Sequence, residues 1–277
     1  MPVFARAMLV LLLLGTAALV VVRALWPLTV PAPATRRRDP ALKWRLAGIV
    51  AGAAAALVAV RIPEAGRGDL LAAPVFGMGV FAGALTGELT RGRPAGAVRR
   101  AGLRVRRTLD YVPRALGTGV TVSTVALFAL ATLTTRTGAP EAGGRVLACP
   151  GGTRGPWPGA YYTVPALAAV VAGLALAAFT LRRVVRRPQA AEPATADDAL
   201  RRRSAEVVTA GTGVLVLVPL TGIALTAGLL LQSSEVTCGA GWWDGAGQAL
   251  TALGFLAFAF AAWYGACLLL PGKRARA

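Results

Sequence analysis

The stretch LLAAPVFGMGVFAGALTGELTRGRPAGAVRRAGLRVRRTLDYVPR, residues 70–114, decides the fold. Its first half is apolar and long enough to cross a hydrocarbon core of about 30 Å as a helix. Its second half is dense with arginine. A hydrophobic span followed directly by arginines predicts a membrane helix whose carboxyl end stays in the cytoplasm.

Composition extends this reading to the whole chain, which has 277 residues, 56% of them hydrophobic and only 15% charged. Soluble domains carry about 25% charged residues. The net charge of +18 comes from arginines that flank apolar spans, which favours anionic lipid headgroups over nucleic acid as the partner. The chain has no histidine, and its glycine-rich stretches lack the spacing and lysine of a P-loop, so we predict no metal site and no cofactor.

Seven apolar stretches are predicted to span the membrane, which makes the chain an all-α, polytopic protein with a single membrane domain. Most of the 30 lysine and arginine residues then fall on one side of the membrane. The positive-inside rule therefore places the N-terminus outside and the C-terminus inside. The predicted spans are residues 8–26, 44–61, 70–89, 115–134, 161–181, 206–231 and 249–270.

Two of the cytoplasmic segments between these spans carry patterns of their own. Residues 91–114 form a basic segment in which apolar side chains occupy one helical face, as in an amphipathic helix lying in the membrane interface. Residues 188–200 are predicted to be a linker, within which Thr195 resembles a helix N-cap followed by acids in the first turn. The helix that starts there is expected to carry Arg201–Arg203 and to run on into the sixth span. The arginines predicted to bind lipid headgroups are Arg99, Arg100, Arg104, Arg106 and Arg107.

Small residues recur at four-residue spacing in the second and third spans. Such ridges let two membrane helices approach closely, because dispersion between backbones replaces the missing hydrophobic drive. We therefore predict that these two spans pack as a hairpin. The ridges consist of Gly48, Gly52 and Ala56 on the second span and Gly79, Gly83 and Gly87 on the third.

A short repeat relates the last four spans. Gly117-Thr118-Gly119-Val120 opens the fourth span, and Gly211-Thr212-Gly213-Val214 lies early in the sixth. Each copy is followed by an external loop that holds one cysteine, so the two hairpins are either a duplication or a coincidence of small residues. Cys149 and Cys238 occupy matching external positions, and because that side is oxidising we predict a disulfide between them.

Glu88 is the one candidate for a catalytic group, because a carboxylate near a membrane-helix end is a functional candidate by default. The alternative is an interfacial ion pair with Arg91 or another nearby arginine. We favour the ion pair, which would leave Glu88 partly solvated.

Two further motifs are Gly87-Glu88-Leu89-Thr90 and the segment from Arg107 to Arg114, Arg-Thr-Leu-Asp-Tyr-Val-Pro-Arg. With the Ala, Gly and Arg bias of the chain, they resemble uncharacterised multi-pass membrane proteins of high-GC actinobacteria. The resemblance covers the third span through the start of the fourth. It implies a plasma-membrane location and supplies no catalytic residues.

Three functions remain open. The first is a non-enzymatic protein that acts as a scaffold, accessory subunit or sensor through membrane-protein partners or lipid. The second is a small permease for neutral or weakly polar solutes, with a path between the two C-terminal hairpins. The third is an enzyme on lipid substrates at the cytoplasmic interface, with Glu88 as acid/base and the arginines holding phosphate.

Overall fold

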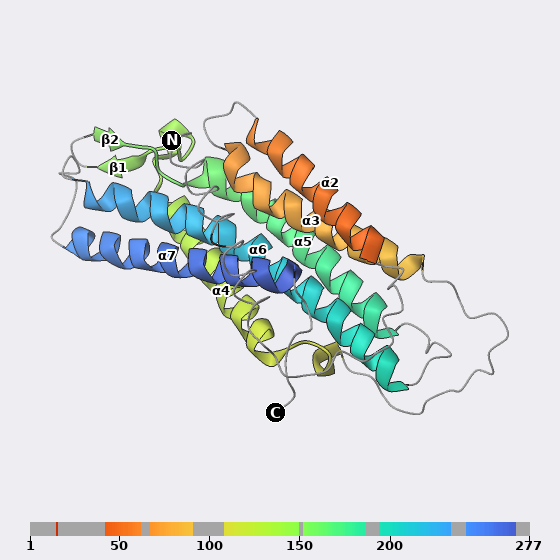
Figure 1. Ribbon diagram of the computed structural model, residues 1–277. Coiled ribbons are helices and arrows are strands. Elements are labelled where there is room, and N and C mark those ends of the chain that lie inside the picture. The colour runs from red at the N-terminus through yellow and green to blue at the C-terminus, as the bar shows by residue number, and fades with distance from the viewer. Residues whose placement is uncertain are drawn as a thin grey trace.

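The computed structural model describes residues 15, 42–61, 67–90, 108–149, 152–186, 194–233 and 242–269. Within these ranges it is a helical bundle with six helices long and apolar enough to cross a membrane (Figure 1). They are α2 (Leu42–Val60), α3 (Arg67–Leu89), α4 (Arg114–Thr137), α5 (Ala160–Arg186), α6 (Ala194–Gln232) and α7 (Trp242–Leu269). The short elements are the 3₁₀ turns η1 (Thr108–Asp110) and η2 (Pro140–Ala142) and the strands β1 (Leu147–Cys149) and β2 (Gly152–Arg154).

The all-α class predicted from the sequence is confirmed, with helices long and apolar enough to cross a membrane at six of the seven predicted spans. Each of these helices begins before the span predicted for it. The largest extensions are in α6, which already begins at Ala194 and so makes residues 194–200 of the predicted linker helical, and in α7, which begins at Trp242. The first predicted span, 8–26, lies outside the described residues except for the helical Gly15. A Cβ built on Gly15 would lie 3.8 Å from the Cβ of Ala262 in α7.

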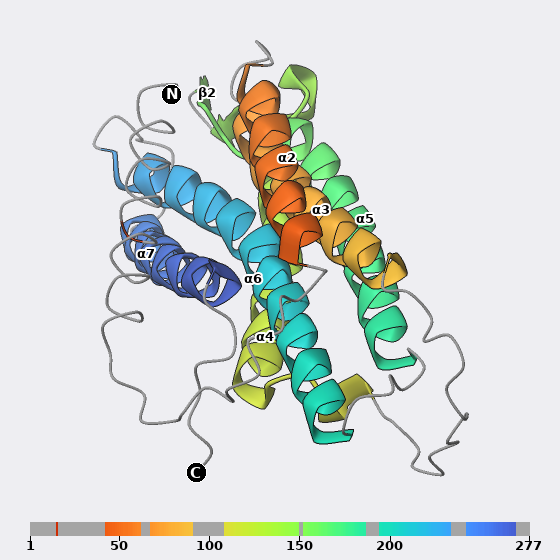
Figure 2. The same ribbon diagram turned by 45° about the vertical axis from the view of Figure 1, so that its right-hand side comes forward.

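The longest helix, α6, is the centre of the bundle. Its 39 residues correspond to about 58 Å, roughly twice the ~30 Å hydrocarbon core. It contacts α3, α4, α5 and α7, and 67% of its most apolar stretch is buried (Figure 2). Leu215 on α6 is fully buried against two glycines, Gly77 of α3 and Gly173 of α5, whose missing side chains leave room for it.

The α2–α3 hairpin packs through glycine. A Cβ on Gly48 would lie 2.6 Å from the Cα of Gly83 and 2.7 Å from the carbonyl oxygen of Gly79, so only glycine fits there. Gly52 meets Gly79 one turn further along. The two ribbons lie side by side in Figures 1 and 2. This backbone-to-backbone approach is the packing expected of small residues every four positions.

Both copies of the short repeat pack against one tyrosine of α7. The second glycine of each copy, Gly119 on α4 and Gly213 on α6, contacts Tyr264. The Tyr264 hydroxyl donates a 2.7 Å hydrogen bond to the carbonyl oxygen of Leu116. The two hairpins nevertheless pack differently, because α6 and α7 touch along their length whereas α4 and α5 touch little.

One end of the bundle, here called the hairpin end, carries β1 and β2, which pair antiparallel. Trp157 is buried there, and its indole N–H donates a 2.8 Å hydrogen bond to the carbonyl oxygen of Thr134. The hydroxyls of Thr135 and Thr163 lie 2.7 Å apart and join the ends of α4 and α5. We call the opposite end, where α2 begins and α3 ends, the network end, because it carries the network of charged side chains described below.

Candidate functional site

Glu88 joins three helices at the network end. The Arg45 guanidinium on α2 donates a 2.7 Å hydrogen bond to the Ser204 hydroxyl on α6. Ser204 lies 3.0 Å from a Glu88 carboxylate oxygen and donates to it. Arg45 and Glu88 also form an ion pair at 3.9 Å, and their side chains are only 8% and 5% exposed. Ser204 therefore bridges two buried, oppositely charged groups.

A second ion pair lies one helical turn away on α6. Arg201 is fully buried and donates through Nε to Asp197 at 2.8 Å. Its Nη1 donates to the carbonyl oxygens of Val184 and Val185, at 3.1 and 2.7 Å. These carbonyls belong to the last turn of α5, where a helix leaves its backbone acceptors without partners. Arg201 thus neutralises Asp197 and caps α5 in one contact.

We call Arg45, Glu88, Asp197, Arg201 and Ser204 the ionic network. Its three α6 members recur at three- and four-residue spacing, so they lie on one face of that helix. Tyr111, just after η1, adds a connection through a 3.0 Å hydrogen bond from its hydroxyl to Asp198. The part of α6 that extends beyond a single membrane span therefore contacts α2, α3, α5 and the segment before α4.

The geometry of the network favours a structural role. Charges removed from water are tolerated when each is paired and hydrogen-bonded, and both ion pairs here meet that condition. The two cations face two carboxylates, and they also donate hydrogen bonds to a hydroxyl and to two backbone carbonyl oxygens. Within the described residues, no three His, Cys, Asp or Glu side chains cluster as metal ligands would.

The residues predicted from the sequence fall into three groups. Glu88 lies in the ionic network, where it is more buried than a partly solvated pair, while Arg91 is outside the described residues. Gly48, Gly52, Gly79 and Gly83 meet at the α2–α3 contact, with Ala56 half-buried on α2 and Gly87 buried on α3. The predicted headgroup arginines, Arg99, Arg100, Arg104, Arg106 and Arg107, lie outside the described residues, as does the amphipathic helix that would carry them.

Only one of the two cysteines of the predicted disulfide lies within the described residues. Cys149 ends β1 and is partly buried, whereas Cys238 lies outside the described residues. Cys267 is a buried thiol of α7. Because the chain has three cysteines, this leaves Cys238 as the cysteine with which Cys149 can pair within the chain. The pairing stays a prediction.

Sequence reasoning missed Arg45, Asp197, Arg201 and Ser204 as members of a site. In the sequence Arg45 is one of several arginines beside a membrane span, with no feature that distinguishes it from the others. For Asp197 and Arg201 a signal exists, because an acid four residues before an arginine is a standard helical ion pair. Nothing in the sequence shows that this pair faces inward while the neighbouring Arg202 and Arg203 are exposed.

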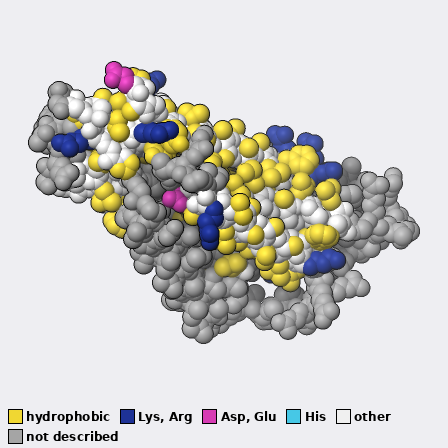
Figure 3. Space-filling model, turned by 90° about the horizontal axis from the view of Figure 1, so that it is seen from above, with side chains coloured by type: hydrophobic (Ala, Val, Ile, Leu, Met, Phe, Trp, Pro, Cys, Tyr) yellow, Lys and Arg dark blue, Asp and Glu magenta, His cyan; other side chains and the backbone are white. Residues whose placement is uncertain are grey.

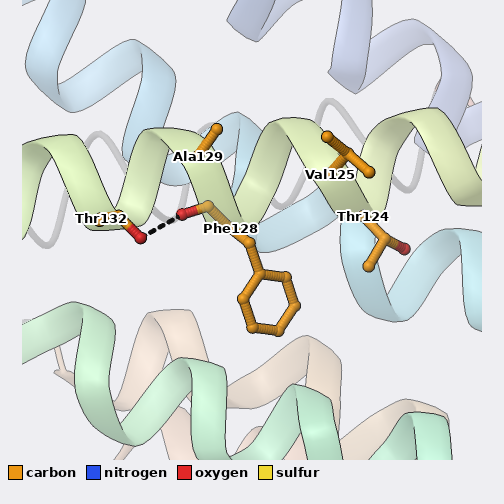
Figure 4. Close-up of a pocket in the computed structure, with 5 residues that line it drawn as sticks. All are labelled: Thr124, Val125, Phe128, Ala129 and Thr132. Carbon is orange, nitrogen blue, oxygen red and sulfur yellow. Dashed lines mark hydrogen bonds between the residues drawn. The ribbon is translucent and has the colours of Figure 1, made fainter.

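Four threonines within the described helices have hydroxyls that are bonded to their own backbone. The hydroxyls of Thr121, Thr124, Thr212 and Thr221 donate to carbonyl oxygens four residues earlier in their own helices. A shallow hollow of about 500 Å³ lies on α4 and is lined by Thr124, Val125, Phe128, Ala129 and Thr132 (Figure 4). Its walls are mostly apolar, so it lacks the polar lining expected of a solute path.

Charge and apolar surface are segregated on the outside. Figure 3 shows a broad hydrophobic surface with Lys and Arg side chains toward both of its ends. Exposed apolar side chains include Val50 and Val58 of α2, Val125 of α4 and Phe255 of α7. In a soluble protein such a surface would drive association, whereas a bilayer solvates it.

Comparisons of the chain with protein-family models, with curated proteins and with solved structures found no match. The likeness to actinobacterial membrane proteins therefore stays a prediction from the sequence.

Proposed function

We propose that the chain is a non-enzymatic, seven-span protein of the plasma membrane that acts through membrane-protein partners or lipid, as a scaffold, accessory subunit or sensor. In this arrangement the N-terminus is outside, and the network end lies at the cytoplasmic interface. The six described membrane helices support the bilayer placement, and the concentration of arginine near the network end supports the orientation.

The observation that carries the non-enzymatic proposal is the environment of Glu88. A general acid or base must reach a substrate proton, directly or through one water. The Glu88 carboxylate is instead directed at Ser204 and Arg45, which come from two other helices. Its role in this proposal is to hold the α2–α3 hairpin against α6, so that the bundle presents a fixed surface to its partners.

The test is to isolate the tagged full chain with its surrounding membrane in lipid-nanodisc particles and measure its stoichiometry by native mass spectrometry. A scaffold or accessory subunit should carry a second protein, or one lipid species, at a fixed molar ratio. The matched control is a tagged, unrelated multi-pass protein of the same cell at equal abundance. Recovery of the chain alone with bulk lipid would contradict the proposal.

A further inference from the structure

The hollow on α4 is aligned with a cation. Thr124, Phe128 and Thr132 repeat every four residues along one face of α4, and the next position in that series is Arg136. This arginine is exposed and lies in the last turn of α4, at the hairpin end. Other exposed arginines of this end, such as Arg154 in β2, do not lie on α4.

The lining of the hollow suits a hydrocarbon chain. The Thr124 and Thr132 hydroxyls donate 2.7 Å hydrogen bonds to the carbonyl oxygens of Val120 and Phe128, so neither requires a polar ligand. The remaining lining residues are apolar, and Val125 is 65% exposed. Figure 4 shows Phe128 projecting from α4 toward α5, where it forms a wall of the hollow.

The distances along α4 from Arg136 to the lining residues match the thickness of one leaflet of a bilayer. At 1.5 Å per residue, Thr132 lies about 6 Å and Thr124 about 18 Å from Arg136 along the helix axis. Half of a ~30 Å hydrocarbon core is about 15 Å, which matches the depth of one acyl chain. Tyr161 marks the interface level on α5, with the Arg145 guanidinium 3.9 Å from its ring centre.

We propose that this hollow binds an acyl chain of a phospholipid whose phosphate is held by Arg136, in the leaflet on the hairpin side. The occupant is argued from charge complementarity, because the cation lies one helical turn beyond Thr132, at one end of the mostly apolar hollow. The inference deepens the proposed function by naming a lipid partner. It rests on the membrane placement of α4 and needs no protein partner.

The test uses the full chain alone in nanodiscs of phosphatidylcholine that contain a minor fraction of phosphatidylglycerol with an acyl-chain diazirine. After photolysis, mass spectrometry should place the label mainly on residues 124–132 of α4. Arg136→Gln should lower this labelling about fivefold, the effect of removing one cation near an anionic headgroup. Arg154→Gln, which removes another exposed arginine of the hairpin end, should leave it unchanged.

A second pair of variants tests the hollow itself. Ala129→Trp fills it and should lower labelling, whereas Val122→Trp adds the same side chain to an exposed α4 position outside the lining and should not. If Ala129→Trp fails to fold, the Arg136 and Arg154 comparison decides. Equal labelling of α2, α4 and α7, or equal effects of the two arginine changes, would overturn the site. So would crosslinks between the α4 helices of two chains, which would assign the hollow to a second copy.

Discussion

At the scale of single residues, two neighbouring arginines of α6 differ in how far they are buried. Arg201 is fully buried, with Asp197 and two α5 carbonyls as partners, whereas Arg202 is exposed. The sequence presents Arg201, Arg202 and Arg203 as one basic run, so the face that turns inward is determined by packing of α5 against α6. The i,i+4 spacing of Asp197 and Arg201 predicts their pairing, while the long-range partners do not follow from local spacing.

Arg201→Met should lower the stability of the protein strongly. The change leaves the Asp197 carboxylate buried without its cation and removes the donors to Val184 and Val185, an effect of about 3–5 kcal/mol for a broken buried pair. Arg202→Met is the matched control and should stay within about 0.5 kcal/mol of the parent. Thermal unfolding in mild detergent measures both, and equal melting temperatures for the two variants would contradict the burial of Arg201.

At the scale of elements, the glycine ridges made the α2–α3 hairpin predictable. Four-residue spacing of small residues on two adjacent spans indicates a close contact without any structure. The N-cap pattern at Thr195 indicates the start of α6, which begins at Ala194. The sequence does not reveal how far α7 extends beyond its apolar stretch, because hydropathy marks the lipid-buried part of a helix and not its ends. In α6 the extension is stabilised by Arg201 and Ser204, whose contacts come from α2, α3 and α5.

Gly48→Ala should weaken the packing of α2 against α3 and lower the stability of the protein. The added Cβ would meet the backbone of Gly83 and Gly79, which cannot turn aside as a side chain can, and overpacking of this kind costs about 1–3 kcal/mol. Gly245→Ala, in the first turn of α7, is the control because an added Cβ there meets nothing within 4 Å. A fall in melting temperature is expected for the first change only, and comparable melting for both would argue against the close approach.

The link between Cys149 and Cys238 would tie the α4–α5 connection to the α6–α7 connection. Closing a loop of this length typically stabilises a protein by about 2–4 kcal/mol through the unfolded state. Mass spectrometry of unreduced peptides should find the two cysteines joined and Cys267 alkylated only after unfolding. Alkylation of Cys149 and Cys238 in protein purified without reductant would refute the link.

At the scale of the whole molecule, composition was sufficient to predict a multi-pass helical membrane protein. The distribution of arginine predicts seven spans with the C-terminus inside, a topology that includes residues 8–26 beyond the described bundle. Lateral order could not be predicted, because hydropathy gives each helix a length but no neighbour. The central place of α6 and the contact of Tyr264 with both Gly119 and Gly213 depend on tertiary packing.

The topology is tested by fusing an enzyme that is active only outside the cytoplasm after Ala277. The fusion should be inactive, while the same enzyme inserted after Thr153, in β2 of the hairpin end, should be active. Immunoblots should show equal amounts of both fusions. Activity of the C-terminal fusion would contradict seven spans with an internal C-terminus.

The central claim is that Glu88 is a structural partner of Arg45 and not a catalytic group. It is tested most directly by a double-mutant cycle on thermal stability in mild detergent. Glu88→Leu and Arg45→Leu should each destabilise the protein, because each leaves one buried charge without its partner. The double variant removes both charges, and the Ser204 hydroxyl can then donate to its other acceptor, the carbonyl oxygen of Leu200 at 3.1 Å.

The account therefore predicts that the double variant is more stable than the sum of the single changes implies, with a coupling energy of about 1 kcal/mol or more. Additive losses, or single variants as stable as the parent, would contradict it.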